Sequence, residues 1–224
     1  MQSSLAEHQP VTQIRSFKPQ DRSAIRQICA DTADAGQPVE NFFPDREVIA
    51  DLVTNYYTQY EPESTFVADN KGEVVGYVTG CVDTHKFKRK MAWPIVPVIF
   101  LKALGRGTLW HPQTIQFLRP NLGLWLKSGF RNANNLDDYP SHLHVNIREG
   151  FRGQQLGQQL VETFCDRARR AGSRGVHAGV SAENDRARHF FEELGFVEVH
   201  QEPRCRSGDG SGRVLYTKIY GMNL

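Results

Sequence analysis

Residues 143–196 read LHVNIREGFRGQQLGQQLVETFCDRARRAGSRGVHAGVSAENDRARHFFEELGF, and this stretch decides the fold. The pattern predicts a strand from His142 to Ile147, a turn from Arg152 to Gly157 and a helix from Leu156 to Ala171. A second strand, from Val176 to Val180, and a second helix, from Asn184 to Leu194, follow. A turn that opens a helix directs several unpaired backbone N–H groups at one place, and the helix dipole adds positive potential there. The stretch therefore predicts a seat for a phosphate or pyrophosphate, and with it a phosphorylated cofactor.

The flanking sequence supplies further strands and helices for the same sheet. Alternation and turn signals predict more strands at Val11–Phe17, Thr65–Ala68, Val74–Asp83, Phe196–His200 and Val214–Tyr220, with a flexible hairpin tip at 208–212. Helices are expected after Asp21 and from about Asp45, because apolar residues recur there at helical spacing. This order implies an α/β protein with a mixed sheet covered by helices on both faces.

Composition is typical of a globular protein. Of 224 residues, 39% are hydrophobic and 23% charged, which fits one domain spanning 1–224 and argues against disorder. The four cysteines form no CxxC pair or zinc-spaced cluster, so we expect buried thiols in a reducing compartment and no metal site. The polar N-terminus lacks a signal-peptide core and no apolar run spans a membrane, which favours a cytoplasmic location.

One segment differs sharply from the rest. Residues 84–136 carry nine Lys/Arg, all three tryptophans and no Asp or Glu, although the whole chain has a net charge of only +2. Such a shift marks an inserted subregion over 84–138, in which Ile99 to Leu104 and Thr114 to Leu126 are expected to contain helices. Three interpretations stay open: a lid packed on the core, a site for an anionic acceptor or acidic protein, and a surface for anionic membrane. Charge alone would allow nucleic acid, but no binding motif supports it.

Two motifs resemble the GNAT superfamily of acetyl-CoA-dependent N-acetyltransferases. The first is the turn from Arg152 to Gly157, which is similar to the family's Arg/Gln-x-x-Gly-x-Gly/Ala pattern; the second runs from Asn184 through Phe190-Phe191-Glu192 to Leu194-Gly195-Phe196. The resemblance implies a mixed, mostly antiparallel sheet flanked by helices, with the basic segment between strands three and four. It also implies that acetyl-CoA binds between two splayed central strands and gives its acetyl group to a primary amine. The tracts at 141–145 and 175–177 loosely resemble acetyltransferase-like domains fused to O-GlcNAc hydrolases.

The resemblance also implies which residues hold the cofactor. Backbone N–H groups of the turn would bind the CoA pyrophosphate, the strand would pair with the amides of the pantetheine arm, and the Asn184 side chain would bond the arm or cap its own helix. The expected cofactor-binding residues are Val145, Ile147, Arg152, Gly153, Gln154, Gln155, Leu156, Gly157, Gln158 and Asn184. Gln155 stands where the family usually has glycine, and we expect a helical backbone there, at which glutamine is harmless.

The catalytic groups are less clearly marked. Phe191 replaces a tyrosine that protonates the leaving thiolate in many family members, and phenylalanine donates no proton. The candidates for the base are His142, His144 and His177, with Asp83 behind them; for each histidine a hydrogen-bonded structural role is the commoner outcome. Tyr216 is a candidate acid or a packing residue, and the Val145 N–H would be an oxyanion donor.

The acceptor is expected to be a small-molecule or peptide amine, in a direct attack within a ternary complex. The alternative is a non-catalytic module that binds acyl-CoA. The oligomeric state is left open by the sequence.

Overall fold

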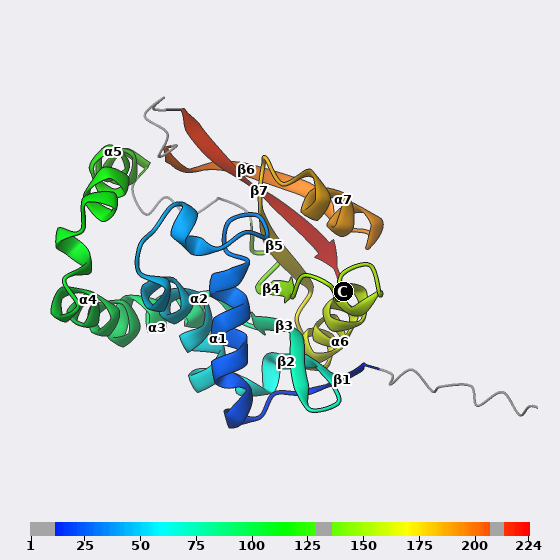
Figure 1. The fold of residues 1–224 in the computed structure, drawn as a ribbon. Helices are drawn as coiled ribbons and strands as arrows, with labels where there is room; N and C mark the ends of the chain where they lie inside the picture. The colour runs from blue at the N-terminus through cyan, green and yellow to red at the C-terminus, as the bar shows by residue number, and fades with distance from the viewer. Residues whose placement is uncertain (1–11, 129–135, 207–212) are drawn as a thin grey trace, which may run out of the picture.

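A seven-stranded mixed sheet forms the centre of the computed structural model, which describes residues 12–128, 136–206 and 213–224 (Figure 1). The strands are β1 (Gln13–Ser16), β2 (Thr65–Asn70), β3 (Glu73–Cys81), β4 (Ser141–Ile147), β5 (Gly175–Ser181), β6 (Val197–Arg206) and β7 (Val214–Asn223). Their order across the sheet is β1-β2-β3-β4-β5-β7-β6. Every neighbouring pair is antiparallel except β4 and β5, which confirms the predicted mixed, mostly antiparallel sheet.

Strands β4 and β5 touch only at their starts. Ser141 pairs with Val176 and His142 with His177, and no further pair follows, although both strands continue to Ile147 and Ser181. Each strand stays paired on its other side, with β3 and β7 respectively. The sheet therefore splits in its middle, and the inner edges of the two strands diverge.

Helices cover both faces of the sheet, as the sequence predicts. On one face lie α1 (Arg22–Asp31) and α2 (Arg46–Tyr60), where Ile25 and Ile28 pack on Val67 and Tyr77. On the other lie α6 (Leu156–Arg170) and α7 (Asp185–Glu193), whose apolar side chains form the largest core cluster with β2 to β5. The apolar stripe of α6 drives this packing, because buried positions recur at helical spacing.

Three helices lie between β3 and β4, within the basic segment. They are α3 (Thr84–Lys90), α4 (Val96–Gly105) and α5 (Pro112–Ser128), and they gather at the left side of the molecule in Figure 1. The backbone breaks at Trp93, between α3 and α4, where the prolines at 94 and 97 predict an interruption. Buried Ile95, Ile99 and Ala103 attach α4 to the core cluster that contains Tyr56 and Tyr57 of α2.

Several boundaries differ from those expected. Strands β6 and β7 are longer than predicted, because the edge strand β6 tolerates Pro203 next to a shift in its register. The predicted hairpin tip at 208–212 lies outside the described residues. Among the described residues, no helix combines the length and hydropathy needed to cross a membrane.

Candidate functional site

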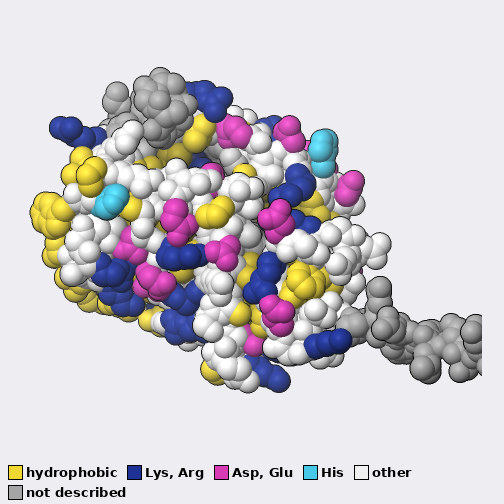
Figure 2. Space-filling view, in the orientation of Figure 1, with side chains coloured by type: hydrophobic (Ala, Val, Ile, Leu, Met, Phe, Trp, Pro, Cys, Tyr) yellow, Lys and Arg dark blue, Asp and Glu magenta, His cyan; other side chains and the backbone are white. Residues whose placement is uncertain are grey.

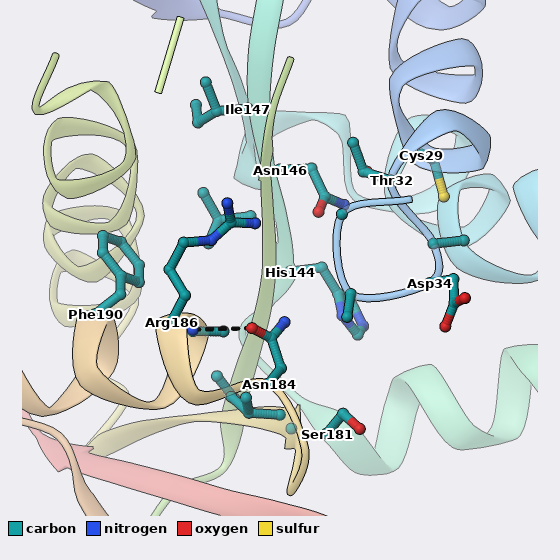
Figure 3. A pocket seen from close by; sticks show the side chains of 18 of the residues that line it. Cys29, Thr32, Asp34, His144, Asn146, Ile147, Ser181, Asn184, Arg186 and Phe190 are labelled. Atoms are coloured by element: carbon teal, nitrogen blue, oxygen red, sulfur yellow. Dashed lines mark hydrogen bonds between the residues drawn. The ribbon is translucent and has the colours of Figure 1, made fainter. Parts of the chain in front are cut away.

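The split in the sheet opens into a cavity of about 1710 Å³ (Figure 3). Its walls come from β4, β5, the turn before α6, helix α7, the loop after α1 and the start of α5. Arg186 and Phe190 extend from α7 on one side, whereas Cys29, Thr32 and Asp34 lie on the other (Figure 3). Segments from both halves of the chain thus meet at the diverging strands.

The glycine turn delivers an uncapped helix start to this cavity. Helix α6 begins at Leu156, and no side chain of the described residues caps it. Within the described residues the N–H groups of Leu156, Gly157 and Gln158 have no hydrogen-bond acceptor, while the next amide, that of Gln159, donates to Gln155 O at 3.1 Å. Free N–H groups at a helix start favour an anion.

The backbone at Gln155 differs from the prediction. Its φ is +60°, in the left-handed region, so the expectation of a helical and harmless glutamine is wrong. The physical reason is the path of the turn, which passes through two left-handed residues, Gly153 and Gln155, to aim the helix start at the cavity. Gly157 is helical, and a Cβ atom there would lie 3.2 Å from the Phe190 ring. This glycine allows α7 to pack closely on the start of α6.

The edge of β4 presents peptide groups to the cavity. Arg148 N–H donates to Val75 O of β3, whereas Ile147 O accepts from Arg152 Nε at 3.1 Å. Because successive peptide groups of a strand point to opposite sides, those of Ile147, Val145 and Leu143 face away from β3 and toward the split. Strand β5 does not pair with them beyond its second residue, so this edge can accept an extended, amide-bearing ligand.

Two guanidinium groups converge beside the turn. A Cβ atom at Gly36 would lie 2.8 Å from Arg186 Nη2 and 3.1 Å from Arg152 Nη2. Neither arginine forms a salt bridge with any carboxylate of the described residues. Burial, and then the charge of Arg186, lower the pKa of Arg152. An unneutralised pair of cations at an uncapped helix start is a binding site for an anion.

Of the three candidate histidines, His144 lines the cavity. It lies on the same face of β4 as Asn146, whose amide donates to Tyr77 Oη at 2.8 Å. Burial, with a smaller contribution from His177, lowers the pKa of His144 to about 4. The ring is therefore neutral at physiological pH, and a ring nitrogen can accept a hydrogen bond.

His142 and His177 are buried and do not line the cavity. The Thr84 hydroxyl donates its proton to Pro140 O, so the Thr84 oxygen accepts a hydrogen bond from His142 Nδ1 at 2.9 Å. The other ring nitrogen of His142, Nε2, therefore carries no proton and accepts from the Tyr57 hydroxyl at 2.6 Å. Burial lowers the pKa of His142 well below its usual value. His177 Nδ1 donates to Tyr139 O at 2.7 Å. These bonds place both histidines in structural networks.

The remaining predicted residues are distributed as follows. Asp83 is exposed and caps α3 by accepting from the N–H groups of His85 and Lys86, away from the cavity. Asn184 lines the cavity and also caps α7, accepting from Ala187 N–H at 3.1 Å. Gln154 is exposed and does not line the cavity.

Phe191 is buried between Phe196 and Tyr220 and reaches the cavity wall. It lies in the apolar core, which explains why an aromatic side chain is kept at this position without a hydroxyl.

Sequence reasoning missed several charged residues of the cavity, among them Arg186 and Asp34. Arg186 lies two positions after Asn184 and follows a helix start, but only the fold shows that it meets Arg152. Asp34 lies in the loop after α1, more than 100 residues away in sequence from β4, and no local signal marks it.

The comparison with protein families agrees with this geometry. The model of the Acetyltransferase (GNAT) family matches residues 128–196, which contain β4, the turn, α6, β5 and α7. Residues 128–196 form a GNAT acetyltransferase domain. Both motifs that predicted a GNAT fold lie within the matched region.

Known proteins similar to this chain differ in length. The structure described as SsHAT is 27% identical, covers 96% of this chain and 98% of its own, and superimposes with a TM-score of 0.74. The acetyl-CoA complex of yncA from Salmonella typhimurium has 18% identity, coverage of 96% and 94%, and a TM-score of 0.56. The Protein O-GlcNAcase of Rattus norvegicus is 23% identical over 189 residues, which make up 83% of this chain. The chain spans only 20% of the length of that relative.

Proposed function

We propose that the chain transfers an acetyl group from acetyl-CoA to a primary amine. The observation that carries this proposal is the meeting of an uncapped helix start and an unpaired strand edge in one cavity. Few ligands combine a diphosphate with an extended chain of amides, and CoA has both. The yncA structure contains acetyl-CoA as its cofactor, which supports the same choice.

The chain's own groups fit this co-substrate. The N–H groups of Leu156, Gly157 and Gln158, with the Arg152 and Arg186 guanidinium groups, would hold the pyrophosphate. The outward peptide groups of β4 would pair with the amides of the pantetheine arm. Acetyl-CoA supplies an activated thioester, and the Val145 N–H would donate to its carbonyl oxygen.

The acceptor would enter from the side of α1 and α5. Asp34 would attract an ammonium group, and neutral His144 would accept a hydrogen bond from the amine as it loses its proton. Direct attack would then need only that the two substrates are held together within the cavity.

A second candidate is a module that binds acyl-CoA without turnover. One observation favours it: no tyrosine of the described residues lines the cavity, and Phe191 stands in the apolar core. A dedicated acid for the departing thiolate is therefore missing from its usual position. The thiolate of CoA has a pKa not far above that of a free cysteine, so it leaves without such an acid, and we place catalysis first.

The test combines calorimetry with an assay of CoA release. Acetyl-CoA is titrated into the chain, and CoA thiol is then measured with polyamines, amino acids, aminoglycosides and lysine peptides as acceptors. The proposal predicts saturable binding and turnover on at least one class of amine, slowed by His144→Gln. Binding without turnover on every class would support the non-catalytic module, and absence of binding would contradict both.

A further inference from the structure

Helix α4 has an apolar face turned to solvent. Ordinary surface helices bury one apolar stripe and show a polar face. Here Ile95, Ile99 and Ala103 form the buried side, yet the outward side is apolar too. Its exposed fractions are 42% for Val96, 46% for Val98, 54% for Phe100, 64% for Leu101 and 42% for Leu104. The one charged residue of α4, Lys102, bonds Asp51 of α2 at 3.1 Å. A helix that is apolar all round needs a covering surface.

Two exposed tryptophans extend this face at both ends of α4. Trp93 precedes the helix and Trp110 follows it, and each is 71% exposed. Hydrophobic side chains gather along the left edge of the molecule, where α4 lies (Figure 2). We call Trp93, Trp110 and the outward side chains of α4 the apolar rim. Aromatic and aliphatic groups of this kind favour the interface between lipid headgroups and acyl chains.

Cations lie beside the apolar rim without acidic partners. The exposed Lys86 and Arg89 of α3 form no salt bridge with a carboxylate of the described residues, and the chain carries no Asp or Glu from 84 to 136. A second copy that docked through the same face would bring two such groups of cations together, which is unfavourable. The partner of this surface is therefore anionic.

We propose that the apolar rim and the α3 cations bind the surface of an anionic lipid bilayer. Helix α4 lies at the outer left edge of the molecule in Figure 1, and its outward apolar side chains are exposed, so that a deformable lipid layer can surround them. Helix α3, which carries these cations, is joined to α4 through residues 91–95 and lies next to it at the left of Figure 1. This inference rests on the apolar rim and the α3 cations alone and is independent of the proposed acetyl transfer.

The test is co-sedimentation of the full chain with phosphatidylcholine vesicles, with and without phosphatidylserine. We expect binding to the anionic vesicles at low salt, a blue shift of the tryptophan fluorescence, and loss of binding at high salt or on phosphatidylcholine alone. The double variant Trp93→Ser/Leu101→Ser should lose most of the binding. Val197→Ser, which changes another exposed apolar side chain, on β6, should not.

Charge is tested separately. Lys86→Glu/Arg89→Glu should weaken binding by at least about tenfold, since each cation near an anionic bilayer contributes roughly 1 kcal/mol. Arg170→Glu, at the exposed end of α6, is the matched control and should bind like the parent chain. No binding to anionic vesicles at low salt overturns the proposal, as does equal loss in the controls. Self-association through the apolar rim without vesicle binding, or capture of an acidic protein in its place, also overturns it.

Discussion

Arg186 offers the sharpest test of the cavity. Its guanidinium meets that of Arg152 beside Gly36, and neither group forms a salt bridge with a carboxylate of the described residues. We therefore expect Arg186→Gln to weaken acetyl-CoA binding. A hydrogen bond to a charged group contributes about 1.5–3 kcal/mol. Because Arg186 is exposed, the loss of binding free energy should lie near the lower end of this range, so that the affinity falls roughly 10-fold.

The same variant has a second signature, in the absence of ligand. Repulsion from Arg186 contributes to the lowered pKa of Arg152, so removing that charge relieves the pair. Thermal unfolding of the ligand-free variant should begin no lower than that of the parent chain, although acetyl-CoA should raise its Tm less. Arg170→Gln, which removes an equal charge from the far end of α6, should change neither quantity. Unchanged affinity in calorimetry, or a less stable ligand-free variant, would refute the reasoning.

Three further predictions concern single positions. Gln155→Gly should remove the strain of a left-handed backbone and raise the free energy of unfolding by up to about 1 kcal/mol, measured as a higher urea midpoint; a lower midpoint would contradict this. Asn184→Ser should keep the cap of α7 and the free energy of unfolding but weaken acetyl-CoA binding. Unchanged affinity would show that Asn184 caps the helix and does not bind the cofactor. His144 has a folded pKa of about 4 and an unfolded value near 6.5, so below about pH 6.5 the unfolded chain gains a proton that the folded chain refuses. Unfolding free energy should therefore fall as the pH drops from about 6.5 to about 4, and His144→Gln should flatten that slope in urea titrations at several pH values.

The central stretch was predictable because its signals are local. The alternation in β4 and β5, the stripe of α6 and the asparagine before α7 lie within a few residues of the elements they define, and those boundaries agree to about one residue. The split between β4 and β5 followed from the family resemblance, and the register of the two strands bears it out.

Other features depend on contacts that the sequence does not display. Helix α3 was not predicted, because its charged residues form no buried stripe, and its capping Asp83 was interpreted as a candidate base. The roles of the histidines were undecided, because the partners of His142, at Tyr57 and Thr84, lie 85 and 58 residues away. The pairing of Arg152 with Arg186 likewise exists only after α7 packs on the start of α6.

Nuclear magnetic resonance tests the central claim most directly. A ¹⁵N-labelled chain is titrated with CoA, and the amide shifts are mapped onto the structure. The account predicts the largest changes at Gly153, at Leu156 to Gln158 and at Val145, where N–H groups face the cavity. Unshifted amides at about millimolar CoA, or changes confined to α3–α5, would contradict it.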